Sequence, residues 1–441
     1  MATQGPSVSL IVLNWNGRKH LAACLESLLG LEYPADRLEV VLCDNGSADG
    51  SVDYVREGFP AVRVVALDQN LGFAEGNNRA AVTCTSEWIG FLNNDMKVEA
   101  PWLKNLVSLL DEHPSAACIG SRIKNWDGSR IDFVGGGVNY QGHGFQLDHG
   151  AKKSERDRER RVLFACGGAM LIRRELFQAV DGFDSDFFAY FEDVDLGWRL
   201  NLLGHDVWYT PRATAFHRHH ATADRLEPHR LRSLYERNAL FTIYKCFEDK
   251  TLAEALPAAL LLLNERGLRL AEVDAEEFRL GPPPGGEVAQ QGPSASAQRL
   301  YAYDPAEVFT ESLAARARRV LREQGLGTAV YKTGRFLRWR TRSFFVHRLL
   351  NILGQVQPEA FLMPGVAVSH YAAASQFAHS LDRVRAKRDW LSERRKRSDE
   401  ELVPLFEDPF FANYSDPRYL AFYKWLTQVV GLDRRLGPAR D

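Results

Sequence analysis

The sequence has few cysteines, no long apolar run and little net charge. Its six cysteines are scattered without metal-binding spacing, so we expect reduced thiols in a cytosolic protein. The best apolar run, residues 255–263, is too short to cross a bilayer, and residues 1–7 lack the pattern of a secretory signal. The formal net charge of -2 argues against a dedicated nucleic-acid binder.

The length and composition are those of a globular chain with more than one domain. The 441 residues exceed one ordinary domain, and 45% hydrophobic with 25% charged residues are globular values. A Pro- and Gly-rich stretch near residues 281–298 is typical of a linker or loop. We therefore expect one domain over residues 1–250 and a mainly helical C-terminal extension over residues 251–441.

Strand and helix patterns alternate in the first quarter of the chain. Apolar runs that suit buried strands cover residues 8–13, 38–43, 62–67 and 88–92, and a helical pattern follows each of them. This alternation predicts an α/β fold with a largely parallel sheet covered on both faces. In such sheets, ligands bind outside the carboxyl ends of the strands.

Short carboxylate, amide and glycine residues follow each expected strand. The four segments are residues 14–17 (NWNG), 44–51 (DNGSADGS), 68–73 (DQNLGF) and 93–95 (NND). Any one of them alone is typical of a turn, because Asn, Asp and Gly dominate turns. All four at one edge of one sheet predict a polar rim that holds a ribose, a base and a metal.

Three carboxylates stand at the start of a further expected helix. Glu192, Asp193 and Asp195 follow an aromatic run, and leucines then recur at helical spacing as far as Gly204. A helix N-terminus favours a charged carboxylate, whereas crowding of like charges raises at least one pKa. A carboxylate between these effects is a candidate general base, although acidic residues at helix starts are also common caps.

Seven ordered motifs resemble the inverting family 2 glycosyltransferases, whose nucleotide-sugar fold is called GT-A. The motifs are residues 8–17, 44–51, 70–78, 93–95, 167–174, 182–184 and 192–199. Within that family the chain is similar to bacterial rhamnosyltransferase-type members that build cell-surface polysaccharides. The resemblance implies a GT-A-type, Rossmann-like nucleotide-sugar domain with a mainly parallel mixed sheet, followed here by the helical extension.

The resemblance also implies a role for each matching residue. Asp193 is the expected catalytic base, with Glu192 beside it, and Asp95 is expected to hold a divalent cation, Mn²⁺ or Mg²⁺. Asn93 stands where the family carries the first aspartate of an Asp-x-Asp motif, so this position contributes no charge. The expected donor-binding residues are Asn14, Asp44, Asn78, Asn93, Asn94, Asp95 and Gly168.

Three histidines follow the expected strand over residues 207–209. In this resemblance a histidine here completes the metal site, and we assign His217, with His219 and His220 facing solvent or phosphate. Histidine suits Mn²⁺ better than Mg²⁺. A basic surface cluster, or phosphate contacts without a metal, is the alternative interpretation.

Together the motifs predict an inverting glycosyltransferase. It would move a sugar from a nucleotide diphosphate donor, dTDP-rhamnose or a UDP-sugar, to a hydroxyl of a glycan or lipid-linked glycan. One alternative is a sugar nucleotidyltransferase, but residues 14–19 (NWNGRK) fit its Gly-rich, lysine-containing loop poorly. The other is a catalytically silent sugar-nucleotide binder, which Asn93 favours and the intact Glu192 and Asp193 oppose.

The C-terminal half has helical patterns but no catalytic motif that we can identify. We expect helices in residues 231–247, 306–324 and 375–398. The basic and aromatic residues of 331–350 suit either an amphipathic packing helix or an interfacial helix on anionic lipid. We expect a cytoplasmic protein with room for peripheral contact at the inner face of the plasma membrane. This stretch, or the basic run 383–397, could also serve contacts in a homo-oligomer.

Overall fold

The computed structural model describes residues 5–218, 227–273 and 363–437. The chain forms two compact units, one of Met1–Asn264 with Ser369–Asp441 and one of Glu265–Val368. The first unit contains all the contacts discussed below. The linker expected near residues 281–298 and the helical patterns of 306–324 and 331–350 lie outside the described residues.

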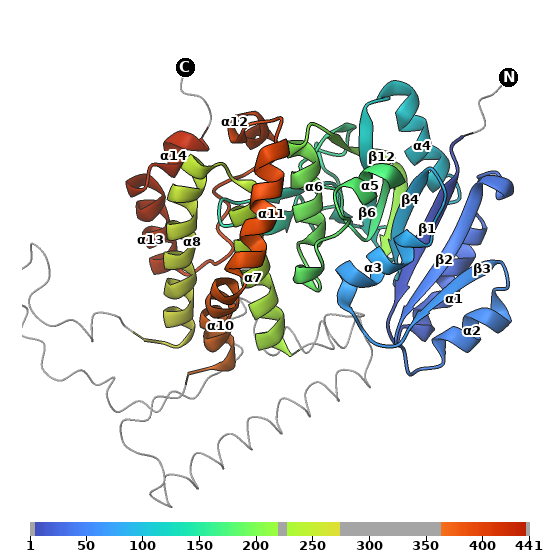
Figure 1. Ribbon diagram of the computed structural model, residues 1–441, viewed down its shortest axis with the longest axis horizontal. Coiled ribbons are helices and arrows are strands. Elements are labelled where there is room, and N and C mark those ends of the chain that lie inside the picture. Colours follow the sequence, from blue (N-terminus) through green and yellow to red (C-terminus); the bar gives the residue numbers. More distant parts are fainter. Residues whose placement is uncertain (1–4, 219–226, 274–362, 438–441) are drawn as a thin grey trace, which may run out of the picture. The chain divides into compact units, whose positions relative to one another are not determined.

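A mixed sheet lies at the core of the first unit. Its strands are β1 (Val8–Asn14), β2 (Leu38–Asn45), β3 (Val62–Leu67), β4 (Trp88–Asn93), β5 (Met96–Val98), β6 (Ala116–Asn125), β7 (Ile131–Phe133), β10 (Arg160–Arg161), β11 (Ala169–Arg173) and β12 (Asp206–His217). The main path runs β10-β12-β6-β11-β4-β1-β2-β3, while β5 pairs with β12 and β7 pairs with β6. Figure 1 labels β12, β6, β4, β1, β2 and β3 of this sheet.

The four strands expected from the first part of the sequence are parallel neighbours in the order β4-β1-β2-β3. Their register places Asn14 beside Asp44 and Leu13 beside Asn93, so the polar segments that follow them meet at one edge. Farther along, β11 is antiparallel to β4 and β6, whereas β12 is parallel to β6. The predicted fold class, a GT-A-type mixed sheet with helices, is confirmed.

Helices follow the strands and cover the sheet. The helices of the sheet region are α1 (Arg18–Leu29), α2 (Ser51–Gly58), α3 (Gly72–Val82), α4 (Trp102–Glu112), α5 (Arg174–Ala179) and α6 (Glu192–Leu202). In α1 the buried residues Leu21, Cys24, Leu25 and Leu28 recur at the spacing of one helix face. This amphipathic pattern is why the segment forms a helix with one side against the sheet.

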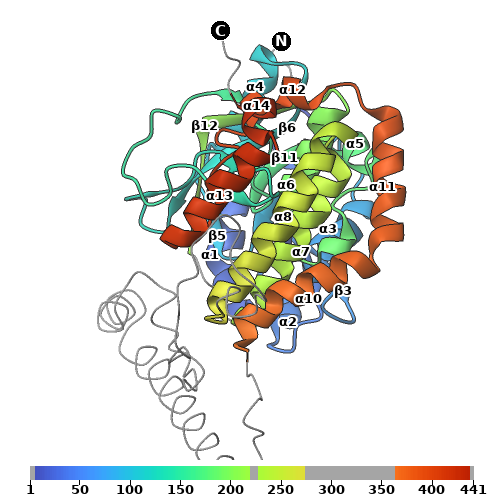
Figure 2. The ribbon, with the colours of Figure 1, turned by 90° about the vertical axis from the view of Figure 1, so that its left-hand side faces the viewer.

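The described C-terminal residues are mainly helical. Their helices are α7 (Pro228–Cys246), α8 (Asp249–Leu270), α10 (Gly365–His379), α11 (Leu381–Arg394), α12 (Asp399–Leu402), α13 (Pro417–Val429) and α14 (Leu432–Arg435). Figure 2 shows α7, α8 and α13 on the viewer's side of the sheet. From α11 onward these elements belong to the same compact unit as the sheet.

A small hairpin of β8 (Gly136–Val138) and β9 (Gly144–Gln146) joins the sheet region to the C-terminal segment. The Val138 amide donates to the Phe406 carbonyl at 3.1 Å, and the Tyr140 amide donates to the Pro409 carbonyl at 2.9 Å. The hairpin is therefore held by residues that lie more than half the length of the chain away in the sequence.

Among the helices that the structure describes, none combines the length and apolar character that a membrane crossing requires.

Candidate functional site

The first group of predicted residues meets at the carboxyl ends of β1, β2 and β4. The Asn14 amide donates to the Asp44 carboxylate at 2.9 Å and to the Ser47 hydroxyl at 3.2 Å, while the Asn94 amide donates to Asn14 Oδ1 at 2.7 Å. Asn14, Asp44 and Asn94 are all buried. Amides and a carboxylate ordered in this way can form hydrogen bonds to a nucleoside.

A tight turn after β1 allows this group to form. Asn16 has a φ of 51°, and its amide donates to the Ser47 hydroxyl at 2.7 Å. A Cβ atom at Gly17 would overlap the side chains of Asn94 and Asn14. The glycine that the sequence shows here is therefore required by a close approach, in addition to its use in a turn.

The second group pairs Asp95 with His217. His217 ends β12, which runs antiparallel to β5 and places His217 opposite Met96, the residue after Asp95. The distance from His217 Nε2 to Asp95 Oδ2 is 3.4 Å. His219 and His220 lie outside the described residues, so the choice among the three histidines stays a prediction.

Asp132, which the sequence reasoning missed, lies on the other side of His217. Its carboxylate is buried in β7 and contacts His217 Nδ1 at 2.7 Å. It also accepts a hydrogen bond from Gln146 Nε2 at 2.9 Å and lies 3.3 Å from His149 Nδ1. A charged residue between Ile131 and Phe133 is the only local signal, and it does not point to a histidine 85 residues away.

The electrostatics of this group favour charged partners. Burial alone would lower the pKa of His217, but its hydrogen bonds to Asp132 and Asp95 raise that pKa to about 9. Burial would raise the pKa of Asp95, but the hydrogen bond and charge of His217 bring it below its ordinary value.

The Asp95–His217 pair fits a divalent cation. Oxygen and nitrogen ligands lie about 2.0–2.2 Å from many metal ions, so two atoms 3.4 Å apart can contact one ion. A carboxylate at Nδ1, as Asp132 provides, is the usual support for a histidine that binds metal through Nε2. Elsewhere in the described part of the chain, Glu112, His113 and Glu159 also cluster. Arg212 already pairs with both of those carboxylates, at 2.8 and 2.5 Å.

The carboxylates at the start of α6 take separate places. Asp193 is half-buried and accepts hydrogen bonds from the amides of Gly167 at 2.9 Å and Val194 at 2.8 Å. Asp195 points instead into the interior, where it pairs with Arg199 at 2.8 Å and Lys245 at 2.6 Å. Side chains two positions apart in an α-helix point about 200° away from each other around the helix axis. Asp193 and Asp195 therefore cannot serve one site.

Burial is the main reason why the pKa values of Glu192 and Asp193 lie above their ordinary values. It raises the pKa of Asp193, against the opposing effect of the Gly167 and Val194 amides. It also raises the pKa of Glu192 well above its ordinary value, and the neighbouring charge of Asp193 adds to the shift. Glu192 is only 6% exposed, and its Oε2 has no hydrogen-bond partner among the described residues. Asp193 is therefore the more accessible base of the two.

Two adjacent glycines connect Asp193 to the donor edge. The backbone amide of Gly167 donates to the Asp193 carboxylate, while the backbone carbonyl of Gly168 accepts from the backbone amide of Asn93 at 2.9 Å. A Cβ atom at Gly168 would lie 2.8 Å from Asn93 Nδ2, which is too close. The candidate base and Asn93 therefore lie on either side of this glycine pair.

In the part of the chain that the structure describes, the hydrogen bonds of the Asn78 side chain go to residues 183 and 185 and not to another predicted donor-binding residue. Asn78 lies in α3. Its side-chain Nδ2 donates to the Phe183 carbonyl at 2.7 Å, and its Oδ1 accepts from the Phe183 backbone amide at 3.0 Å. These two contacts fasten residues 182–185 to α3. The predicted contact of Asn78 with the base of the nucleotide stays a prediction.

The loop before α6 has an unusual backbone that the sequence did not reveal. Phe188, Tyr190 and Phe191 have φ values of 64°, 70° and 66°, which are unfavourable for residues other than glycine. Asn238 of α7 donates to three carbonyls in or beside this loop, at 3.0, 2.9 and 2.7 Å. Such strain persists only where surrounding contacts over-determine the backbone.

Comparison with known proteins gives the family. The model of the family described as Glycosyl transferase family 2 matches residues 9–181. The chain is 30% identical over 232 residues to an N-acetylglucosaminyl-diphospho-decaprenol L-rhamnosyltransferase of Mycobacterium tuberculosis, covering 47% of this chain and 75% of that protein. It is 32% identical over 230 residues to the O-antigen biosynthesis protein RfbC of Myxococcus xanthus, covering 50% of this chain and 18% of that protein.

A solved structure is also similar. It is the mannosyltransferase PcManGT from Pyrobaculum calidifontis in complex with GDP-Man and Mn²⁺, at 18% identity and a TM-score of 0.45, covering 85% of this chain and 88% of that chain. The 30% identity to the M. tuberculosis protein, 75% of whose length is covered, shows the family together with the family model. The chain belongs to glycosyl transferase family 2, is a glycosyltransferase, and is of the rhamnosyltransferase type.

Proposed function

We propose that the protein is an inverting glycosyltransferase that uses a nucleoside diphosphate sugar, dTDP-rhamnose or a UDP-sugar. The observation that carries this proposal is the glycine pair that holds Asp193 on one side and Asn93 on the other. It brings a candidate base next to the strand ends where Asn14, Asp44 and Asn94 form one hydrogen-bonded group.

Asp193 acts as the general base in this proposal. It takes the proton of an acceptor hydroxyl while that oxygen attacks the anomeric carbon. The new carbon–oxygen bond forms as the bond to the diphosphate oxygen breaks, and the nucleoside diphosphate leaves with the electron pair. Attack opposite the leaving group inverts the anomeric centre. The raised pKa of Asp193 brings its proton affinity closer to that needed near neutral pH.

The donor is held by two groups of residues in this proposal. Asn14, Asp44 and Asn94 bind the nucleoside, while Asp95 and His217 hold Mn²⁺ or Mg²⁺. When bound, such a cation neutralises charge that develops on the departing diphosphate. Fixing donor and acceptor together supplies much of the remaining acceleration.

The acceptor is a hydroxyl of a glycan or lipid-linked glycan in polysaccharide synthesis. The name of the M. tuberculosis relative, with its diphospho-decaprenol group, supports the lipid-linked choice. The name of the Myxococcus protein supports a role in surface polysaccharide. With a lipid-linked acceptor, the protein would act in peripheral contact with the inner face of the plasma membrane.

Thermal shift with UDP-, GDP- and dTDP-linked sugars, with and without Mn²⁺ or Mg²⁺, tests the donor site. We expect a metal-dependent shift with one nucleotide class. Asp193→Asn should keep that shift while transfer falls about 10²- to 10⁴-fold, because only the proton acceptor is lost. Asp181→Asn, which changes an exposed carboxylate, is the control and should leave transfer intact.

Other outcomes would redirect the assignment. Unchanged transfer by Asp193→Asn would remove Asp193 from its role as the base. A folded wild-type protein that binds the donor but transfers no sugar to any glycan would favour the silent binder. Release of pyrophosphate from a nucleoside triphosphate and a sugar phosphate would indicate the nucleotidyltransferase, which family membership does not favour.

A further inference from the structure

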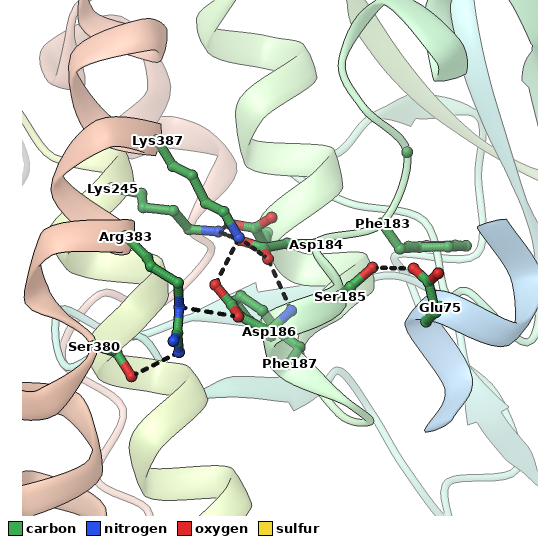
Figure 3. A network of polar contacts seen from close by, with 12 residues as sticks. Glu75, Phe183, Asp184, Ser185, Asp186, Phe187, Lys245, Ser380, Arg383 and Lys387 are labelled. Carbon is green, nitrogen blue, oxygen red and sulfur yellow. Dashed lines mark hydrogen bonds and ion pairs between the residues drawn. The ribbon is translucent and has the colours of Figure 1, made fainter. Parts of the chain in front are cut away.

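Two cations of helix α11 reach across to the loop that precedes α6 (Figure 3). Lys387 Nζ lies 2.5 Å from Asp184 Oδ1 and 2.7 Å from Asp186 Oδ2. Arg383, one turn earlier on α11, lies 3.5 Å from Asp186. Lys387 and Asp184 are 203 positions apart in the sequence.

The contacts continue inward to α6 itself. Lys245 of α7 is 2% exposed and lies 2.5 Å from Asp184 Oδ2 and 2.6 Å from Asp195 Oδ1. Asp195 follows the candidate base Asp193 by two residues on the same helix. A ladder of alternating charges therefore runs from Lys387 through Asp184 and Lys245 to Asp195. The two lysines together hold the pKa of Asp184 well below its usual range, despite its burial.

The loop between Asp184 and Glu192 depends on such outside contacts. It contains one short 3-10 turn, Ser185–Phe187, and its left-handed residues Phe188, Tyr190 and Phe191 follow that turn and precede α6. Arg237 of α7 donates to the carbonyls of Asp186 and Phe187 at 2.9 and 3.0 Å. From the other side, the Phe73 amide at the start of α3 donates to the Phe188 carbonyl at 2.5 Å. Side chains of α7 and α11 thus grip the loop opposite α3.

We propose that Lys387, assisted by Arg383, is a positioning residue for sugar transfer, because it fixes the loop that sets the start of α6 and hence the place of Asp193. The inference rests on the proposed role of Asp193 as the base. We call the contacts of Lys387 and Arg383 with Asp184 and Asp186 the brace. Helix α11 lies beyond residues 9–181, which the family model matches, so the two cations of the brace come from the C-terminal part of the chain. The C-terminal region thereby contributes to the active site without touching substrate.

The energetics separate this role from simple stabilisation. The Lys387 side chain is 39% exposed, and an exposed cation contributes little to stability. Its partner Asp184 is only 6% exposed, but this carboxylate keeps its ion pair with the buried Lys245 when Lys387 is removed, so it is not left as an unpaired buried charge. A displacement of a catalytic group by about 1 Å, by contrast, lowers the rate about 100-fold. Loss of Lys387 should therefore affect turnover much more than folding or donor binding.

Lys387→Met tests the brace in the full-length protein, with the nucleotide sugar that produces the thermal shift as the probe. We expect kcat to fall about tenfold or more while the KM for the donor and the nucleotide-induced shift stay unchanged. Amide hydrogen exchange in residues 184–193 should become faster. Lys387→Arg should restore most of kcat, because it keeps a cation between Asp184 and Asp186.

Two further variants keep the test decisive. Arg394→Met removes another cation of α11, which pairs with the exposed Glu393. It should leave kcat and the amide hydrogen exchange of residues 184–193 unchanged. Arg383→Met removes the outer ion pair with Asp186 and a hydrogen bond to Ser380 Oγ at the start of its own helix. The Arg383 side chain is 63% exposed, so this variant should show a smaller effect in the same direction. If Lys387→Met fails to fold, Arg383→Met carries the test.

The brace is overturned if Lys387→Met leaves kcat and exchange unchanged, or if it loses donor binding together with transfer. Failure of the proposed function looks different. Asp193→Asn would then retain transfer, whereas the exchange rate of residues 184–193 in Lys387→Met would still decide whether the brace exists.

Discussion

At the scale of single residues, Asp132 shows how a buried carboxylate can order a site from outside it. Side chains of His217, Gln146 and His149 all approach its two oxygens. The contact at His217 Nδ1 leaves Nε2 directed at Asp95. In the proposed cation site, Asp132 would therefore orient the His217 ring so that Nε2 faces the ion.

Asp132→Asn should weaken Mn²⁺ binding about 10- to 100-fold, because the amide orients the imidazole less well than a carboxylate. Titration followed by electron paramagnetic resonance of free Mn²⁺ measures this directly. His149→Gln changes another partner of Asp132, a side chain that is 51% exposed, and should have little effect. Unaltered Mn²⁺ affinity in Asp132→Asn, alongside weakened affinity in Asp95→Asn, would contradict the role of Asp132.

Glu192→Gln should change the pH dependence of stability. Because burial and the charge of Asp193 raise the pKa of Glu192, the folded protein keeps a proton that the unfolded chain loses above about pH 4.5. This side chain therefore lowers stability increasingly as the pH rises from there toward the folded-state pKa. We expect Glu192→Gln to raise Tm by about 1–3 °C near pH 8 and to leave it unchanged near pH 4. Calorimetry at both pH values checks this, and a lower Tm near pH 8 would refute it.

At the scale of elements, the start of α3 and the loop before α6 fit against each other at a glycine. Gly72 has a φ of 84°, and a Cβ atom there would overlap the Phe188 carbonyl. The same carbonyl accepts hydrogen bonds from the backbone amides of Phe73 and Ala74, the second and third residues of α3. The helix end and the strained loop therefore stabilise each other.

Gly72→Ala should lower stability by about 1–3 kcal/mol, because it adds both a steric overlap and an unfavourable φ. Gly58→Ala is the matched control, since a Cβ atom there meets nothing within 4 Å and its φ is ordinary. It should be neutral or slightly stabilising. Urea denaturation compares the two variants, and equal midpoints would argue against the close fit of Gly72 and Phe188.

At the scale of the whole molecule, the C-terminal segment completes the core of the sheet-containing unit. Phe406 is fully buried, and its ring centroid lies 4.8 Å from that of Trp198 in α6 and 6.1 Å from that of Phe247 after α7. Its carbonyl also holds the β8–β9 hairpin. The chain thus returns from its far end to the helix that carries Asp193.

Phe406→Ala should lower stability by about 3–5 kcal/mol, because it leaves a cavity beside Trp198. Phe411→Ala is the comparison, since Phe411 is 39% exposed and stacks only on Phe145 among the ring contacts of the described residues. We expect a loss of about 1 kcal/mol or less there. Denaturation of the full-length protein followed by Trp fluorescence measures both. A small loss in Phe406→Ala would mean that the C-terminal segment packs independently.

The sequence by itself determined the first four strands, the helices that follow them and the polar rim. Hydrophobic periodicity is a local property, so β3 was bounded without error and β1, β2 and β4 to within two residues. The ordered motifs then identified the family. The parallel register that follows from this pattern brings Asn14 beside Asp44, as the sequence implies.

Only the tertiary structure decided which side chains meet across long separations. The pairs Asp132–His217 and Lys387–Asp184 join elements that no local pattern relates. It also separated Asp193 from Asp195 and engaged Asn78 with Phe183. The physical reason is that periodicity specifies which face of an element is buried, whereas the partner of a buried charge depends on how distant elements pack together.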